Sequence, residues 1–284
     1  MGPVQTFTAF MNNAEYHEHP AISKSHLDAI NISPLHYWSR YVDPNRSAPT
    51  PTLAMEFGTA VHMAVLEPDL YLKTYKRAPE LSRTTKAGKE AWAEAGADGH
   101  TLIKSDEWAQ IEAMRQQIFA HPAAGKALNL PGQAEQTFLV NDPFTGLPTK
   151  CRPDYFTDSG WLIDLKTTQD ASLKGFQRSI ANFRYHVQAA YYTSVIKAAQ
   201  GVAPRGFLFI AVEKTYPYAV QVFKCSQSLL DAGEIEATRN LRQLTDAFDE
   251  YTLETPWPGY SLNPVEIDLP TWAANAVPPS TQTY

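Results

Sequence analysis

The order of elements after Gln133 constrains the fold of this chain more than any other feature, because at that point the hydrophobic pattern changes from a helical period to a strand period. Three strand-like runs, "AEQTFLV", "LPTKCRPDYF" and "GWLIDLKTT", are joined by turns that are rich in Asp, Pro and Gly. Helices are then predicted at about 171–181, 184–200 and 226–252, and strands at 206–213 and 218–225. An antiparallel meander followed by alternating helices and strands predicts an α/β core with a mixed sheet.

The first half of the chain has mainly helical patterns. Residues 20–42 are predicted as helix with an interruption at Ser33-Pro34, where proline can start a new helix. Further helices are predicted at 53–66 and 105–128, with a partly helical excursion at 77–99. We expect a single domain over 1–284: a helical N-terminal part at about 20–130, a core at about 133–252 and an irregular, proline-rich tail at 253–284.

Composition narrows the possible functions. A chain of 284 residues that is 44% hydrophobic can bury a sizeable core. Its net charge of −6 argues against a surface coated in DNA-binding charge, so any DNA contact must be local. Two cysteines are too few for a disulfide framework, a four-cysteine zinc site or an iron–sulfur cluster. No apolar run approaches the roughly 18 residues of a membrane span, and we expect a cytoplasmic protein.

The run "WLIDLKTTQ" places an acid and a base on one strand face, since side chains two residues apart point the same way. Asp164 and Lys166 form this pair, and Asp154 on the preceding strand can lie near Asp164. Two adjacent carboxylates repel, and a shared proton or a divalent cation relieves the repulsion. Carboxylates that hold Mg²⁺ or Mn²⁺ beside an ammonium suit phosphodiester hydrolysis. A surface salt bridge would also explain an isolated D-x-K tripeptide.

Neighbouring motifs favour the first interpretation. Pro153-Asp154 followed by Asp164-Leu165-Lys166 resembles the two halves of the PD-(D/E)XK nuclease motif. Gly58 and His62 resemble the G-x-x-x-H helix of the RecB-like branch, in which glycine would allow close approach and the imidazole would reach inward. The pair Gln188 and Tyr192 resembles the Q-x-x-x-Y helix of that branch. The resemblance implies a restriction-endonuclease-like core, with a central mixed β-sheet flanked by helices and an N-terminal helical elaboration.

Longer stretches resemble the RecE, or exonuclease VIII, family of phage recombination nucleases over about residues 20–225. They are "AISKSHLDAINISPLHYW", "FGTAVHMAVLEP", "TGLPTKCRPDYF", "LIDLKTT" and "YHVQAAYY". The family implies a processive 5′-to-3′ exonuclease on linear double-stranded DNA that uses one or two Mg²⁺ ions per site, with Mn²⁺ possible. Such an enzyme would release 5′-mononucleotides and leave 3′ overhangs. The family also implies a homo-oligomeric ring, a RecT-like single-strand annealing partner and a phage or prophage gene in a bacterial host.

The resemblance also implies roles for single residues. Metal would be bound by His62, Asp154, Asp164 and the main-chain carbonyl of Leu165. Lys166 would assist the nucleophile, and Gln188 would position water or phosphate beside Tyr192. Candidates for contact with the DNA end are Lys24, Ser25 and Arg152. Glu135 is either a further acid of the site or a solvated strand-edge residue.

Three other interpretations remain open at this point. The chain could be a PD-(D/E)XK endonuclease, a repair nuclease of other polarity, or a non-catalytic protein that binds DNA ends. A closed circular substrate separates an endonuclease from an exonuclease, and digestion in Mg²⁺ separates an enzyme from a binder. The stretch "EYHEH" at 15–19 looks like a metal-ligand cluster, but its proline-bounded setting predicts a flexible, solvated patch.

Overall fold

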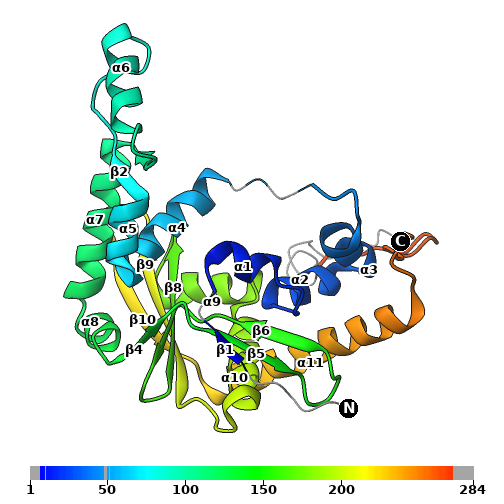
Figure 1. The fold of residues 1–284 in the computed structure, drawn as a ribbon. Helices are drawn as coiled ribbons and strands as arrows, with labels where there is room; N and C mark the ends of the chain where they lie inside the picture. Colours follow the sequence, from blue (N-terminus) through cyan, green and yellow to red (C-terminus); the bar gives the residue numbers. More distant parts are fainter. Residues whose placement is uncertain (1–6, 10, 48–49, 51, 271–284) are drawn as a thin grey trace, which may run out of the picture.

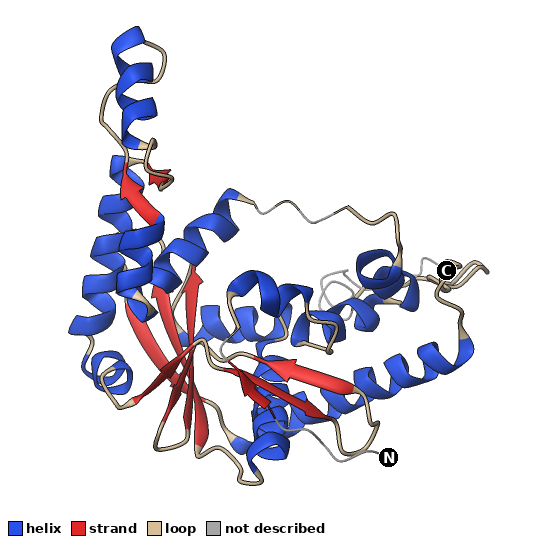
Figure 2. Ribbon diagram, viewed as in Figure 1, coloured by secondary structure: helices blue, strands red, loops and turns tan. Residues whose placement is uncertain are grey.

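The computed structural model describes residues 7–9, 11–47, 50 and 52–270. At its centre is a five-stranded sheet with the strand order β10-β9-β8-β7-β4, in which β8 and β9 are parallel and the other neighbours are antiparallel (Figures 1 and 2). The prediction of a mixed sheet is therefore confirmed. Its strands are β4 (Gly132–Ala134), β7 (Tyr155–Thr157), β8 (Trp161–Thr168), β9 (Gly206–Glu213) and β10 (Val220–Lys224).

A second sheet has the order β1-β5-β6, formed by β1 (Phe7–Ala9), β5 (Thr137–Asn141) and β6 (Pro148–Cys151). The prediction of one continuous meander is wrong in this respect, because its first two strands are each divided between the two sheets. One strand breaks next to Glu135, whose φ is 51°, and the other at Pro153, which has no N–H for a ladder. The result is a hairpin ribbon that bends at these two points.

Helices cover both faces of the central sheet, as the alternation of buried side chains requires. Phe209 packs into a core cluster with α2 (Lys24–Ile32), α9 (Leu173–Asn182), α10 (Tyr185–Gln200) and α11 (Gln227–Glu250). The next residue, Ile210, packs into a second cluster with α4 (Leu53–Leu66), α7 (Ser105–Ala120) and α8 (Pro122–Leu128). The arrangement of sheet and helices confirms the predicted α/β class.

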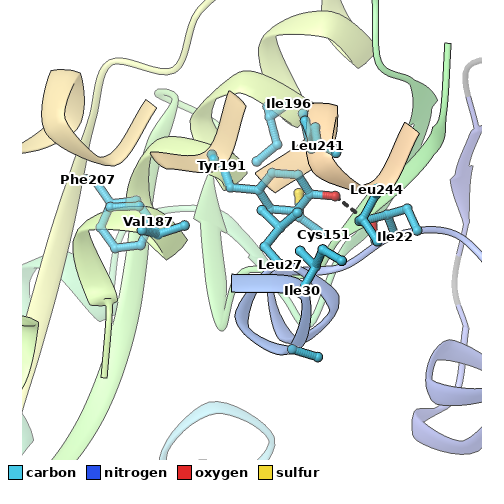
Figure 3. Packing of buried hydrophobic residues seen from close by; sticks show 14 of the residues in the cluster. Ile22, Leu27, Ile30, Cys151, Val187, Tyr191, Ile196, Phe207, Leu241 and Leu244 are labelled. Carbon is cyan, nitrogen blue, oxygen red and sulfur yellow. Dashed lines mark hydrogen bonds between the residues drawn. The ribbon is translucent and has the colours of Figure 1, made fainter. Parts of the chain in front are cut away.

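The helix α10 lies at the centre of the first cluster (Figure 3). Val187 and Tyr191, one turn apart, pack among side chains of the sheet and of α2 and α11. The hydroxyl of Tyr191 is buried and donates a hydrogen bond of 2.6 Å to the Ile22 carbonyl. This hydrogen bond ties α10 to the segment before α2 and helps to fix the face of α10 that meets β8.

The N-terminal part is less uniformly helical than predicted. The predicted helix at 20–42 is divided into α2, α3 (Pro34–Tyr37) and a π-helix, η1 (Trp38–Val42). The predicted helix at 105–128 ends at Ala120 and restarts as α8, because Pro122 occupies the first position of a new helix. The predicted excursion at 77–99 protrudes from the body (Figure 1) and contains α6 (Lys86–Ala95). It is preceded by α5 (Pro68–Thr74) and β2 (Tyr75–Arg77) and followed by β3 (Thr101–Ile103).

The C-terminal segment is irregular, as predicted, in the part that the structure describes, and residues 271–284 lie outside it. Residues 251–270 form neither helix nor strand, yet Trp257 is buried and stacks on Tyr37 with ring centroids 5.6 Å apart. Among the helices of the described ranges, none combines the length and apolar character of a membrane span.

Candidate active site

The candidate site begins at an open edge of β8. Strand β7 pairs with β8 only at Leu162 and Ile163, so the second half of β8 has β9 on one side and no β7 partner on the other. There the N–H of Leu165 donates a 2.7 Å hydrogen bond to the Asp154 carboxylate. The N–H and C=O of one strand residue point to the same side, so the Leu165 carbonyl faces the same gap. This carbonyl and Asp154 are therefore brought together, as the resemblance implies.

The acid and base of β8 lie on one face, as the strand alternation predicts. Lys166 Nζ lies 2.5 Å from Asp164 Oδ1, and the Gln188 side-chain amide of α10 donates to Asp164 Oδ2. Asp164 is fully buried, yet its Oδ1 accepts no well-directed hydrogen bond, although the lysine is close. The fold therefore holds a carboxylate whose hydrogen-bonding capacity is not filled.

Burial and neighbouring charges shift the pKa values of Asp164 and Lys166. Burial, and secondly the charge of Asp154, raises the pKa of Asp164 to about 7, although Lys166 and Gln188 act in the opposite direction. Burial alone would lower the pKa of Lys166, but the carboxylates of Asp164 and Asp154 outweigh it and the pKa is raised. The lysine is therefore an ammonium ion at neutral pH. Perturbed carboxylates that converge on a charged lysine are typical of catalytic sites.

His62 reaches the site from α4, with Nδ1 3.3 Å from Asp154 Oδ2. Burial lowers the pKa of this imidazole, which favours the neutral form that binds metals. The expected steric role of Gly58 is wrong for this structure, since a Cβ there would lie 3.8 Å from Thr167 Oγ1, an ordinary contact. The neighbouring turn of α4 is thus not held close to β8 by the absence of a side chain.

Glu135 lies next to the acidic residues, at the bend of the ribbon. Its N–H donates to the Asp154 carbonyl at 3.1 Å, and its carboxylate lies 3.0 Å from Arg152 Nε. Burial and then the charge of Asp154 raise the pKa of Glu135 to about 8, and Glu67 and Asp164 contribute in the same direction. The Glu135 side chain is 27% exposed and paired with Arg152, so it is partly buried rather than freely solvated. Glu67, which caps the C-terminal end of α4, belongs to none of the sequence motifs.

The remaining candidates differ in their distance from the centre. Tyr192 is partly buried, and burial raises its pKa, with the charges of Asp164 and Asp154 as further causes. Lys24 Nζ pairs with Asp28 at 2.6 Å, and burial lowers its pKa, to which the nearby charge of Lys166 also contributes. The hydroxyl of Ser25 lies 3.0 Å from that of Ser23 and has no recorded bond to the acidic residues within the described chain. Lys24 and Tyr192 thus adjoin the site, whereas Ser25 is linked to its own helix start.

The "EYHEH" stretch belongs largely to α1 (Asn13–Glu18) and is helical rather than irregular, while its predicted solvation is confirmed for Glu15, His17 and Glu18. Asn12 and Glu15 form a capping box, a signal that the N-x-x-E spacing carries. The buried Lys150 ammonium donates to the main-chain carbonyls of Tyr16 and His19, so the end of the helix is fixed. The guanidinium of Arg152 lies 4.2 Å from the Tyr16 ring centroid. Sequence reasoning missed that α1 forms one wall beside Arg152.

The donor set fits a divalent cation such as Mg²⁺ or Mn²⁺, which prefers oxygen ligands. The Asp154 carboxylate lies beside the His62 imidazole and the strand edge of Leu165, and the buried Asp164 Oδ1 has free acceptor capacity. In the described part of the chain no three such side chains already form a ready-made metal cluster. Asp164 Oδ1 lies against the Lys166 ammonium and its Oδ2 accepts from Gln188, while Asp154 Oδ2 accepts from the Leu165 N–H. To bind a cation, these carboxylates would exchange their present partners for the metal.

Comparison with known structures supports the fold. A crystal structure from Eubacterium rectale, described as "Putative exonuclease", matches with a TM-score of 0.61 and 13% identity over 86% of this chain and 89% of that chain. A structure of SSO0001 covers 70% of this chain and 86% of that chain at 15% identity, but its TM-score of 0.29 supports no argument. No curated protein matches the sequence. At these identities the first similarity concerns the fold alone.

The sequence itself matches a protein family over most of its length. The family described as "PDDEXK-like domain of unknown function (DUF3799)" matches residues 23–260, which span the first core helix, the bent ribbon, β8 and α10. The predicted PD-(D/E)XK fold class is thereby confirmed. The chain belongs to this family of PDDEXK-like domains.

Proposed function

We propose that this protein is a metal-dependent nuclease that hydrolyses phosphodiester bonds of DNA. The observation that carries the proposal is the fully buried Asp164, which contacts the Lys166 ammonium on one side and adjoins Asp154 on the other. A purely structural salt bridge between Asp164 and Lys166 would not require Asp154 nearby, whose charge raises the pKa of Asp164. A site that binds a divalent cation next to a phosphate requires more than one carboxylate.

The residues divide between metal binding and proton handling. One or two Mg²⁺ or Mn²⁺ ions held by His62, Asp154, Asp164 and the Leu165 carbonyl would activate a water molecule and screen the phosphate. Asp164 keeps the Lys166 ammonium in place, where it can orient the attacking water and stabilise the charge that develops on the phosphate.

Gln188 and the cationic side chains suit the substrate. The Gln188 amide lies in contact with Asp164, within reach of a bound water or a phosphate oxygen, and Tyr192 adds a hydroxyl from the same helix. Arg152 and Lys24 border the site and would contact phosphates near the DNA end, with Ser25 as a further candidate at the start of α2. Glu135 holds the Arg152 guanidinium and would release it, or bind metal itself, when substrate and cation enter.

The finer proposal is a processive 5′-to-3′ exonuclease of the RecE type that degrades linear double-stranded DNA to 5′-mononucleotides. The order and spacing of the five RecE-like stretches support it, as does the description of the Eubacterium rectale neighbour. The resulting 3′ overhangs would pass to a RecT-like annealing protein in single-strand annealing recombination. We place this activity in the cytoplasm of a bacterial host, from a phage or prophage gene.

Direction can be tested with a linear duplex that is labelled at either the 5′ or the 3′ end of one strand, beside a covalently closed circle. The proposal predicts early release of a labelled 5′-mononucleotide in Mg²⁺ and an intact circle. Early loss of the 3′ label would assign the opposite polarity. Nicking of the circle would instead indicate an endonuclease, and binding without cleavage in Mg²⁺ or Mn²⁺ would indicate a DNA-end binder.

A further inference from the structure

A cavity of about 340 Å³ adjoins the candidate site on the side of α9. Lys166 lines it, together with the polar side chains of Arg178, Ser179 and Asn182 from α9. Lys214 also lines the cavity and is a further cation there. Arg178 is paired with Asp170 at 3.3 Å. The size falls in the range of pockets that hold small organic ligands. Its polar, cationic lining suits an anionic one.

An aromatic pair connects this cavity with the catalytic candidate Lys166. The Lys166 ammonium lies 4.7 Å from the Tyr185 ring centroid, and the Phe183 ring lies nearly parallel to Tyr185 with centroids 5.5 Å apart. Both rings line the cavity. Phe183 is 59% exposed, so its outer face has no packing role within the described chain. An exposed, nearly stacked ring beside a phosphate-handling lysine offers a platform for a base.

The turn that presents Phe183 is held rigidly. The next residue, Arg184, has a φ of 53°, a left-handed conformation that is uncommon for side chains other than glycine. Its guanidinium is fixed by Asp28 at 2.9 Å, Glu236 at 3.1 Å and Asn240 at 2.6 Å. Such a conformation persists when the surroundings determine it, and it is frequent at functional sites.

The start of α2 fixes the same turn from the other side. Lys24 Nζ donates a 2.7 Å hydrogen bond to the Phe183 carbonyl. The turn is therefore anchored both to α11, through Arg184, and to the helix that carries two of the candidates for the DNA end. A ring that is exposed but fixed in this way is preorganised for a partner, because little entropy is lost when the partner binds.

We propose that Phe183, with Tyr185 behind it, is a stacking subsite for an unpaired nucleobase at the DNA end, and that the cavity accommodates the attached sugar-phosphate next to the bond that is cut. This inference deepens the proposed nuclease function and rests on it. A base on Phe183 would leave its phosphate directed toward Lys166. The subsite would thus favour ends whose terminal nucleotide is unpaired.

The test measures the affinity of wild-type and variant proteins for two kinds of DNA end, so that the loss of the ring and the loss of the base can be compared. Short duplexes with one frayed end carry either normal or abasic terminal nucleotides, and fluorescence anisotropy measures their affinity in Ca²⁺, with the DNA verified as intact. Stacking of about 1–3 kcal/mol predicts that the wild type binds normal ends roughly 5-fold to 150-fold more tightly than abasic ends. Phe183→Ala should bind both ends equally weakly, and Phe183→Trp should restore the difference. Phe144→Ala, which removes another exposed ring from the β5–β6 turn, should behave as the wild type.

The outcomes separate the subsite from the proposed function. A Phe183→Ala variant in which the ratio of the two affinities stays at the wild-type value overturns the subsite, whether or not the variant binds both ends more weakly than the wild type. Cleavage in Mg²⁺ is measured separately on the same proteins, so persistent cleavage without the preference overturns the subsite alone. The preference without any cleavage overturns the nuclease and leaves the subsite supported. Absence of DNA binding overturns both.

Discussion

At the residue scale, the central fact is that β8 buries a carboxylate where an apolar side chain would be expected. Burial of an ionised carboxylate is costly, and its usual remedies are a cationic partner or a proton. Asp164 has Lys166 and Gln188 as partners, yet its pKa is still raised to about 7, first by burial and then by Asp154. Because a neighbouring acid adds to the cost of burying Asp164, this pair favours a site that binds a cation over a simple salt bridge.

Replacement of Lys166 by methionine tests the role of the ammonium, since methionine keeps most of the apolar stem. We expect the rate of DNA cleavage in Mg²⁺ to fall by roughly 10²- to 10⁴-fold, because the charge that assists water and phosphate is lost. The measurement is the initial rate on a labelled linear duplex. Lys224→Met, an exposed lysine on β10, is the matched control and should keep wild-type activity. A Lys166→Met enzyme of wild-type rate would contradict the assignment.

The carboxylates also predict how stability depends on pH. Burial, together with Asp154, raises the folded-state pKa values of Asp164 to about 7 and of Glu135 to about 8, above their unfolded values. At pH values between the unfolded and folded pKa, these two carboxyl groups bind more protons in the folded state, so their contribution to the free energy of unfolding decreases as pH rises from about 5 to 8. Burial lowers the pKa of His26 and His62, whose contribution changes with pH in the opposite direction. The difference in Tm between the wild type and Asp164→Asn in EDTA should therefore fall as pH rises.

A divalent cation should reverse the effect, because it replaces the protons that relieve the repulsion. We expect Mg²⁺ or Mn²⁺ to raise Tm more at pH 8 than at pH 5.5. Asp164→Asn should reduce both the pH slope in EDTA and the stabilisation by metal, whereas Asp158→Asn, in the exposed turn before β8, should change neither. A Tm that does not respond to metal at pH 8 would contradict the donor set.

At the scale of elements, α10 is positioned by its contact with α11 as well as by the sheet. A Cβ at Gly233 of α11 would lie 2.1 Å from the His186 carbonyl, so the two helices approach too closely for any side chain there. We expect Gly233→Ala to destabilise the protein by about 1–3 kcal/mol, measured by chemical denaturation.

Gly58→Ala is the matched control, because it is the same substitution within a helix but has room for the methyl group. It should leave stability unchanged or raise it by up to about 1 kcal/mol through helix propensity. Equal losses in the two variants would mean that helix packing does not explain the Gly233 effect.

Much of the core could be predicted from the sequence, because period-two and period-3.6 patterns determine which faces are buried. The mixed sheet and the shared face of Asp164 and Lys166 followed from these patterns, whereas the position of Gln188 in the site was expected only from the resemblance to the Q-x-x-x-Y helix. The bend of the ribbon did not, since it depends on tertiary pairing with β1 and on the left-handed Glu135. The sequence predicted that Asp154 would lie near the end of β8 that carries Asp164, but not the open strand edge that makes its contact with Leu165 possible.

At the scale of the whole molecule, an acidic chain must confine its contacts with DNA. Its net charge is −6, while Lys24, Arg152 and Lys166 gather around one site. We propose a homo-oligomeric ring that encloses the DNA, which would supply processivity topologically. Light scattering after size exclusion should then give a mass several times 31.7 kDa. A DNA trap added after binding should not stop digestion of the bound duplex. A monomer that the trap stops at once would contradict the ring.

The most direct test of the central claim is cleavage of a linear duplex by the wild type, Asp164→Asn and Asp158→Asn, each in Mg²⁺ and in EDTA. If the buried pair on β8 is the centre of a metal-dependent nuclease, the wild type and Asp158→Asn cut DNA only in Mg²⁺, and Asp164→Asn does not cut although it remains folded. Cleavage by folded Asp164→Asn at the wild-type rate, or equal cleavage by the wild type in EDTA, would contradict the claim.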